Sequence, residues 1–479
     1  MKYLLGGIVL LAVIFLGIII IRALMFKPKT EKNEEAADIE IDEEKVTYHL
    51  AQMIRCKTVS RYDAALIDEE EFNKFRLLLP KIYPNVFKTC SYERVGNTGI
   101  LITWKGKNSD NPTVLMSHYD VVPADEEKWD KPPFKGIVED GILWGRGTLD
   151  TKGTLCGILE AGEYIIGLGF TPENDIYFAF AGDEEVSGDG APSIVKELKA
   201  RGIRPAMVLD EGGAVVEKVF PGVKESCALI GIGEKGPMNL ELSAKSNGGH
   251  ASAPPPHTVV GILSQAVVKI EKHPFKSKLT KPAKEMFDTL GRYSTFAYKV
   301  IFANLWCFKP LLDLLCRRMG GELNALMRTT FAATMMEGGS APNVLPTEAK
   351  VVANMRLLGT DTSKSAAEYI KNVIKDENIN IRIMDAMNAS PFSKTEGKYW
   401  DKLKGAIRKT WPNAVVSPYL MVACSDSRHY CEISEYVYRF SAIALSKEER
   451  ALIHGHNERI SVDKIINIVK FYIRLISSI

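Results

Sequence analysis

The chain has 479 residues, of which 46% are hydrophobic and 25% are charged, so its composition is that of a folded globular protein and not of a disordered one. This length is long for a single hydrophobic core and favours two or three domains. Sixty-one lysines and arginines stand against 59 acidic residues, and the net charge of +2 gives no reason to expect a nucleic-acid partner.

The N-terminus carries an unbroken apolar run. Residues 4–21 read LLGGIVLLAVIFLGIIII, which is long enough to span a bilayer as a helix. We interpret residues 1–26 as a single transmembrane anchor. A cleaved signal peptide is the alternative, but the run exceeds the usual signal core and no small-x-small cleavage site follows it. The basic residues after the run favour a cytoplasmic body by the positive-inside rule.

Residues 27–45 are predicted to be an acidic spacer. Residues 31–44 read EKNEEAADIEIDEE, with eight acidic residues in fourteen. Such a segment is expected to stay extended and solvated. For its second half, an acidic helix start is an equal alternative, because carboxylates stabilise the first turn of a helix.

After the spacer, short apolar runs alternate with helical patterns. TVLMSH, DIYFAFAG and AMVLDEGG predict strands, whereas TKGTLCGILEAGEYIIGLG and APSIVKELKARG predict helices. This alternation is typical of an α/β fold with a mostly parallel central sheet flanked by helices. We therefore assign residues 46–234 to the first part of an α/β domain.

Residues 235–358 are predicted to form an inserted α+β domain. MNLELSAKS and AKVVANMRLLG alternate as strands do, and TVVGILSQAVVKIEKH has a helical period. The α/β pattern returns in residues 359–479, which should complete the first domain. Residues 296–316, FAYKVIFANLWCFKPLLDLLC, are interpreted as a helix packed inside the inserted domain, with an acyl chain or the membrane as the alternative partner.

Polar clusters stand where the predicted strands end. They are His118 with Asp120, Asp183 to Glu185, and Asp210 with Glu211, to which the glycine-rich turn LWGRGTLDTKG adds Asp150. In parallel sheets the carboxyl ends of the strands line one crevice, so these clusters should converge. Adjacent carboxylates at the edge of a core lose hydration unless a cation offsets the cost. One imidazole with several carboxylates suits divalent metals, zinc above all.

The spacing of the residues within two of these clusters also indicates which roles they could have. His118 and Asp120 lie two residues apart in an extended segment and point to the same face, so Asp120 can accept the second ring N–H of the histidine. The adjacent Glu184 and Glu185 point in different directions, so one can ligate a metal while the other acts as a base. A solvated loop is the usual interpretation of a lone DEE stretch, but its occurrence beside the other strand-end clusters favours a metal site.

Eight motifs in order along the chain resemble those of a known family. They are SHYDVVPA, WGRGTLDTKG, AGDEEVSG, LDEGG, GGHASAPP, APNVLPTEA, ANMRLLGTD and HGHNERI. Together they resemble the dizinc metallopeptidase family of aminoacylase, carboxypeptidase G and succinyl-diaminopimelate desuccinylase. Residues 300–312 and 324–335 are most similar to the carboxypeptidase S and N-fatty-acyl-amino acid hydrolase branch. The resemblance covers the chain after the spacer, and implies a zinc-exopeptidase-like catalytic domain with an inserted lid and dimerisation domain.

The resemblance also implies two divalent metal ions, with zinc expected and cobalt or manganese as alternatives. Asp150 would bridge the two ions, His118 and Asp210 would complete one of them, and Glu185 and His454 would complete the other. His454 is chosen over its neighbour His456 only by the family's H-x-x-x-E spacing. Two Zn²⁺ ions bring four positive charges, which the three carboxylates and one hydroxide would balance.

Three catalytic roles follow from the resemblance. Glu184 would be the general base that takes a proton from the attacking water and returns it to the leaving amine. Asp120 would orient His118. His250, in GGHASAPP, would donate a hydrogen bond to the oxyanion, from the inserted domain or, in dimeric relatives, from the partner subunit; a cap on a glycine-rich turn is its alternative role.

Three further residues are expected to bind substrate. Asn343 and Arg356 resemble the groups that grip the terminal carboxylate of the substrate, although an arginine on an exposed strand face is nearly as good an interpretation of Arg356. Arg428 lies in VACSDSRHY, where the family often has a glycine-rich stretch of the form GGTD[AS]R. This departure concerns the shape of the substrate pocket and not the metals.

The sequence thus predicts a membrane-anchored hydrolase that cleaves an amide bond next to a free carboxylate, in an N-acyl amino acid or at the C-terminus of a small peptide. A dipeptidase or N-acyl-diamino acid deacylase of the same family is the alternative, and a metal-free binding module is a remote one that predicts at least one broken ligand. The expected partners are a small substrate, the membrane and a second copy through the lid. The resemblance favours an extracytoplasmic catalytic domain, whereas the basic residues after the apolar run favour a cytoplasmic one. The sequence therefore does not determine on which side of the membrane the catalytic domain lies.

Overall fold

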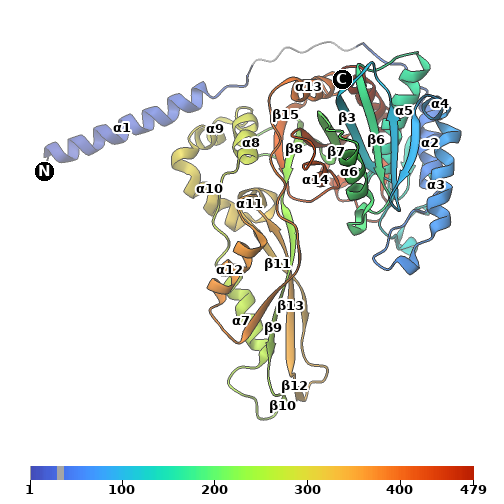
Figure 1. Cartoon of the computed structure of the whole chain (residues 1–479). Coiled ribbons are helices and arrows are strands. Elements are labelled where there is room, and N and C mark those ends of the chain that lie inside the picture. Colours follow the sequence, from blue (N-terminus) through green and yellow to red (C-terminus); the bar gives the residue numbers. More distant parts are fainter. Residues whose placement is uncertain (1, 30–36) are drawn as a thin grey trace.

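The computed structural model describes residues 2–29 and 37–479, which form a large sheet domain, a small sheet domain and a separate N-terminal helix (Figure 1). The large sheet has the strand order β1-β2-β6-β3-β7-β16-β8-β15. Its strands are Ser91–Val95 (β1), Gly99–Trp104 (β2), Asn108–His118 (β3), Asn174–Ala181 (β6), Met207–Val216 (β7), Cys227–Glu234 (β8), Val415–Met421 (β15) and Val437–Leu445 (β16). The pairs β3–β6, β3–β7, β7–β16 and β8–β15 are parallel. The predicted mostly parallel sheet is therefore confirmed.

Helices cover both faces of this sheet, which is why its inner strands are apolar on both sides. One face is covered by α5 (Lys152–Gly167) and α16 (Val462–Ile476), which pack together and against α2 (Glu43–Ile54) and α13 (Lys398–Thr410). The other face carries α6 (Gly190–Ala200) and α14 (Ser427–Tyr430). This part of the chain also forms the helices α3 (Glu69–Ile82), α4 (Pro84–Thr89) and α15 (Lys447–Arg450).

A three-stranded sheet joins distant parts of the chain beside the large sheet. It consists of β4 (Ile137–Glu139), β5 (Ile142–Trp144) and β17 (Arg459–Ser461), in the order β17-β5-β4. The pairing of β17 with β5 places the C-terminal HGHNERI motif next to the glycine-rich turn that follows β5.

The small domain is an antiparallel four-stranded sheet with the order β11-β13-β9-β14. Its strands are Gly236–Lys245 (β9), Thr330–Glu337 (β11), Glu348–Leu357 (β13) and Ile379–Ala386 (β14). Helices α7 (Val259–Lys272) and α12 (Ser363–Ile374) pack on one face, and residues alternate between buried and half-buried along β13 as a one-sided sheet requires. A two-stranded ladder, β10 (Gly249–His250) with β12 (Val344–Leu345), forms the far tip (Figure 1).

Two expectations about the inserted segment were wrong. We expected it to end at residue 358, but α12 and β14 complete the small sheet, because β14 pairs with β9 and α12 shares its core with α7. The pattern of α12 is that of any amphipathic helix, so the sequence could not assign it to a domain.

The second correction concerns the apolar segment 296–316. It forms α9 (Phe296–Phe302) and most of α10 (Leu305–Met319). Helix α9 packs against α8 (Lys281–Gly291) and α10 packs against α9, outside the small domain. Because α8 packs on edge strand β15, these helices belong to the core of the large domain. Helix α11 (Gly321–Met327) then leads to β11.

Helix α1 (Lys2–Met25) projects from the body of the protein (Figure 1). Tyr3–Met25 is long and apolar enough to cross a membrane, although a signal sequence would have the same properties. Of the predicted spacer, residues 30–36 lie outside the described part. Its second half contains the start of α2, where Asp42 caps the helix by accepting from the N–H of Lys45, so the helix-start alternative is confirmed there.

Candidate active site

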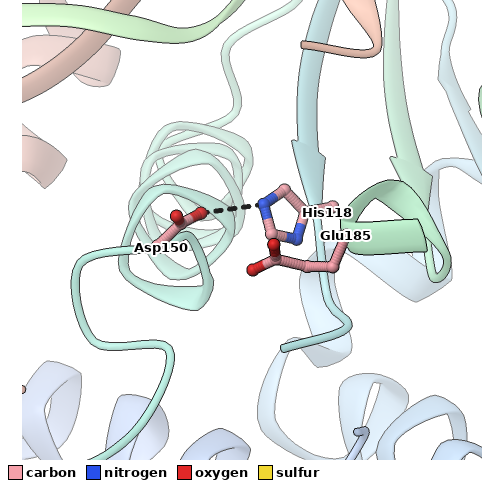
Figure 2. Close-up of side chains that lie close together, drawn as sticks. All are labelled: His118, Asp150 and Glu185. Atoms are coloured by element: carbon pink, nitrogen blue, oxygen red, sulfur yellow. Dashed lines mark hydrogen bonds and ion pairs between the residues drawn. The ribbon is translucent and has the colours of Figure 1, made fainter. Parts of the chain in front are cut away.

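The predicted metal ligands lie at the carboxyl edge of the large sheet. His118 is the last residue of β3, Asp210 lies in β7, and Glu184 and Glu185 begin a short 3₁₀ turn just after β6. Asp150 precedes α5, and Figure 2 shows its carboxylate facing the His118 ring, with Glu185 beside them. Strand ends that are far apart in the sequence therefore converge, as the parallel topology predicts.

Asp150 lies between two histidines. Its Oδ1 is 3.0 Å from Nε2 of His118, and its Oδ2 is 3.0 Å from Nε2 of His454. Oε2 of Glu185 is 3.1 Å from the same His454 nitrogen. An aspartate that offers one oxygen to each of two imidazoles has the arrangement of a carboxylate that bridges two cations.

The donor set fits divalent cations. His118, Asp150 and Glu185 form one group of ligand atoms within 4.8 Å of one another, and His118, Glu184 and Glu211 form a second. Oε1 of Glu185 is buried and has no hydrogen-bond partner in the described part of the chain. A buried carboxylate oxygen without a partner is costly unless a cation meets it. Imidazole nitrogens with carboxylate oxygens suit zinc, cobalt and manganese.

Asp120 contacts both His118, at the end of β3, and the turn after β6 that carries Glu184 and Glu185. Its main-chain oxygen is 3.0 Å, and its Oδ1 is 3.3 Å, from Nδ1 of His118. The same carboxylate accepts the main-chain N–H groups of Glu184 at 3.2 Å and Glu185 at 3.1 Å. The His-x-Asp spacing predicts the first contact. The second depends on how β3 and β6 lie side by side, which the sequence does not encode locally.

Burial and neighbouring charges shift the protonation of the site. Burial raises the pKa of Glu184 well above its ordinary value, and burial with the charge of Asp150 raises the pKa of Glu211 to about 8. Burial opposes ionisation of Asp150 too, but hydrogen bonds from His118 and His454 hold its pKa below the ordinary value. Hydrogen bonds to Asp150 and Glu185 raise the pKa of His454 to about 10. Without cations, the site therefore retains protons.

Glu211, and not Asp210, faces His118. Oε1 of Glu211 is 3.2 Å from His118 Nε2, whereas Asp210 is buried and its Oδ2 accepts the N–H of Ser427 at 2.9 Å. Neighbouring residues of a strand point to opposite faces, so the two carboxylates have different surroundings. The assignment of Asp210 to one of the ions stays a prediction, and Glu211 is a second candidate for the same position.

Glu458 holds the turn that presents Asp150. Its fully buried carboxylate accepts from Nη1 of Arg146 at 2.7 Å and from the main-chain N–H groups of Gly147 at 3.1 Å and Leu149 at 2.8 Å. In the sequence, Glu458 served only as a marker for choosing His454. Its supporting role was missed because no local pattern connects it with the glycine-rich turn.

Arg356 and Arg428 approach each other near Cys424. Nη1 of Arg356 is 3.2 Å from the Cys424 sulfur. Nη2 of Arg428 donates to the main-chain oxygen of Asn388 at 2.8 Å, whereas its Nη1 makes no hydrogen bond in the described chain and lies 3.9 Å from Oε2 of the buried Glu234. A guanidinium has several N–H groups and can bind a carboxylate through two of them.

His250 and Asn343 lie together at the tip of the small domain. The N–H of Ala251 donates to the Asn343 main-chain oxygen at 3.0 Å, and Nδ1 of the exposed His250 is 2.7 Å from the hydroxyl of Ser252. The tip projects away from the large sheet (Figure 1). Within the described residues of one chain, neither side chain has a recorded contact with the carboxylate cluster.

Comparison with known proteins agrees with this geometry. The sequence pattern of peptidase family M20/M25/M40 matches residues 114–478 of this chain. The chain is 36% identical over 437 residues to "Probable carboxypeptidase S-like 2" of Dictyostelium discoideum, with 90% of this chain and 84% of that protein covered. It is 34% identical over 487 residues to an N-fatty-acyl-amino acid synthase/hydrolase of Xenopus tropicalis, with 99% and 94% covered.

A solved structure shares the fold. An M20 family metallo-carboxypeptidase from Sulfolobus solfataricus superposes with a TM-score of 0.66 at 16% identity, covering 92% of this chain and 99% of that chain. At this identity the likeness concerns the fold alone, and it confirms the expected pair of a catalytic sheet domain and an inserted smaller domain.

Proposed function

This chain belongs to peptidase family M20/M25/M40, and we propose that it is a membrane-anchored hydrolase with two divalent cations, zinc by expectation, that cleaves an amide bond next to a free carboxylate. The observation that carries this proposal is the position of Asp150, which offers one oxygen to each of two histidines, next to the unpartnered oxygen of Glu185. The substrates are N-acyl amino acids or the C-terminal residues of small peptides. The name of the Xenopus relative favours the first class, whereas the name of the Dictyostelium relative favours the second.

The chain supplies the proton transfers. Two divalent cations at this site would polarise the amide carbonyl and acidify a water molecule. Glu184 accepts a proton from the attacking water and returns it to the leaving amine. Asp120 holds the main chain of Glu184 and the ring of His118, so the base and the ligand keep a constant relative position.

Binding of the substrate carboxylate is assigned to Arg356 and Arg428. Nη1 of Arg428 makes no hydrogen bond in the described chain, although it lies 3.9 Å from Glu234, and a guanidinium can bind a carboxylate through two N–H groups, which supports this role. His250 donates to the oxyanion, and Asn343, its neighbour at the tip, contacts the substrate. Since the tip lies away from the cluster within one chain, these two roles require a homodimer in which the lid of one copy reaches the site of the other.

A substrate panel tests the proposal. The full chain, purified in detergent with zinc added, is incubated with N-acyl amino acids of increasing acyl length and with dipeptides, and Glu184→Gln serves as the inactive control. We expect hydrolysis of N-acyl amino acids with long chains preferred. Cleavage restricted to short peptides would assign the dipeptidase alternative. Absence of hydrolysis with two bound metal equivalents would contradict the proposed reaction.

A further inference from the structure

Helices α9 and α10 carry an exposed apolar face. Seven large apolar side chains on these two helices are at least 39% exposed: Phe296, Tyr298, Trp306, Leu311, Leu314, Leu315 and Met319. On the opposite side of α10, Leu312 and Cys316 are buried in the core. A helix that is apolar both toward the core and toward solvent presents an interaction surface, because such a large exposed patch is unusual on a soluble protein.

The end of α1 docks beside this face through specific contacts. The buried Asn304 donates from Nδ2 to the main-chain oxygen of Ile19 at 3.1 Å, and Nε of Arg22 donates to Oδ1 of Asn304 at 3.1 Å. Ile19 and Ala23 are 3% and 1% exposed. The rings of Phe15 and Trp306 meet edge to face with their centroids 5.8 Å apart. Directional hydrogen bonds and packing therefore fix α1 relative to α9 and α10.

These contacts lie inside the apolar run of α1 and not beyond it. The run ends at Ile21, whereas Trp306 touches Phe15, six residues earlier. Six residues of α-helix correspond to about 9 Å along the axis. When α1 crosses a bilayer, Trp306 must therefore lie well below the end of the apolar run, at the depth of Phe15.

We propose that α9 and α10 are a second membrane-binding element, which lies in the bilayer interface beside α1 with its exposed apolar face covered by lipid. The partner is the bilayer that α1 crosses, because Trp306, at one end of the face, contacts Phe15 in the apolar run of α1. The inference rests on the anchoring part of the proposed function and not on the hydrolytic reaction.

Charge and shape around this face agree with lipid as its partner. A cavity of about 480 Å³ opens between α1, α8 and the start of α10, lined by the apolar Phe302, Leu305 and Trp306, by the basic Arg22, Lys284 and Arg292, and by Asp288, which pairs with Arg292. The exposed Arg317 and Arg318 stand at the end of α10, where they also line a cavity beside the small domain. Apolar side chains bordered by basic ones, with a tryptophan between them, are typical of elements that lie in the interface of anionic membranes.

Contacts between Arg292, at the end of α8, and the C-terminal end of α1 also hold the large domain close to the bilayer. The guanidinium of Arg292 lies 4.5 Å from the ring centroid of Phe26 and donates to the main-chain oxygen of Lys27 at 3.1 Å. The protein is therefore attached directly at the end of α1, and the edge of the large sheet formed by β15, against which α8 packs, is the side closest to the membrane.

Tryptophan quenching by brominated lipid tests the proposal on the full chain. The protein is reconstituted into vesicles of phosphatidylcholine and phosphatidylserine, with or without bromine on the acyl chains. Trp306 is 61% exposed, whereas the other tryptophans are buried or half-buried in the body. We expect brominated lipid to remove the emission of about one of the six tryptophans. The loss should vanish in Trp306→Phe and persist in the control Trp144→Phe.

Vesicle flotation separates this inference from the others. Protein that floats with the vesicles while wild type and Trp306→Phe are quenched equally would overturn the docking of α9 and α10 and leave the anchor intact. Protein that does not float would overturn both. A dimer in detergent that Leu314→Asp dissociates, together with absence of quenching, would assign the face to a second copy. Hydrolysis of a soluble substrate is independent of all these outcomes.

Discussion

The carboxylate cluster at the edge of the large sheet and the tip of the small domain differ in burial and in the number of side chains from distant segments that meet there. In the cluster, four side chains from distant segments lie within about 3 Å of a neighbour, and Glu185 still has an oxygen without a partner. At the tip, the exposed side chain of His250 forms hydrogen bonds only with the neighbouring Ser252 among the residues that the structure describes. Under the proposed function, one chain supplies the predicted cation ligands, whereas the predicted oxyanion donor His250 would come from a second copy.

The largest expected effect is that of Asp150→Ala. This change removes the carboxylate shared by both histidines, so neither cation position keeps its ligand set. We expect the variant to lose both metal equivalents on dialysis, measured by elemental analysis, and to have activity at background. Asp110→Ala, at an exposed aspartate of β3, is the matched control and should keep both. Full metal content in Asp150→Ala would remove it from the ligand set.

Glu184→Gln should separate chemistry from metal binding. The amide keeps the size of the side chain but cannot take a proton, so kcat should fall by about 10²- to 10⁴-fold while the metal content stays unchanged. Steady-state kinetics and elemental analysis of the same preparation provide both values. Metal loss as large as that of Asp150→Ala would contradict the separate roles of the two residues.

The trans role of the tip predicts complementation. His250→Ala should lower kcat by about 10²- to 10³-fold without loss of metal, because an oxyanion donor is removed. When His250→Ala chains are mixed with Glu184→Gln chains, a mixed dimer contains one site with both residues intact. We expect activity to reappear on mixing. Two variants that stay inactive together, in a preparation shown to exchange subunits, would place His250 in the site of its own chain or outside catalysis.

Glu211→Gln and Asp210→Asn distinguish the two carboxylates of β7. Because Glu211 faces His118 and Asp210 accepts from Ser427, the geometry predicts the loss of about one metal equivalent in Glu211→Gln and a smaller loss in Asp210→Asn. Elemental analysis after equal dialysis compares them directly. The reverse order would support the assignment that the family resemblance implies.

The smallest expected effect is on stability in the presence of a chelator. Glu211, with a pKa of about 8, retains between about pH 5 and 8 a proton that the unfolded chain has released, and His454, with a pKa of about 10, does so above about pH 6.5. Stability of the metal-free protein should therefore fall as the pH rises from about 5 to 8, by about 1.4 kcal/mol per pH unit for the proton of Glu211. The half-exposed His454 adds a smaller loss above about pH 6.5, because solvent screens its ion pairs. Thermal unfolding with and without zinc measures this. A melting temperature that rises over that range in chelator would contradict the prediction.

Much of the site could be predicted because its residues are marked locally. His118 and Glu184 to Glu185 stand directly after apolar runs, and parallel strands bring their ends together. The role of Glu458 could not be predicted, because it depends on the pairing of β17 with β5 across the whole length of the domain. The choice between Asp210 and Glu211 depends on which face of β7 points to the cluster. The local sequence does not show which of these two adjacent side chains lies on that face.

By itself, the sequence determined the classes of element, the α/β sheet, the residue types of the metal site and the apolar N-terminal helix, since each follows from periodicity, composition or an ordered set of motifs. Only the tertiary structure decided that α12 and β14 belong to the small domain, that α9 and α10 dock on α1, and that the tip stands apart from the cluster. Local patterns state which face of an element is apolar. Which partner covers that face is set by packing between segments that are distant in the chain.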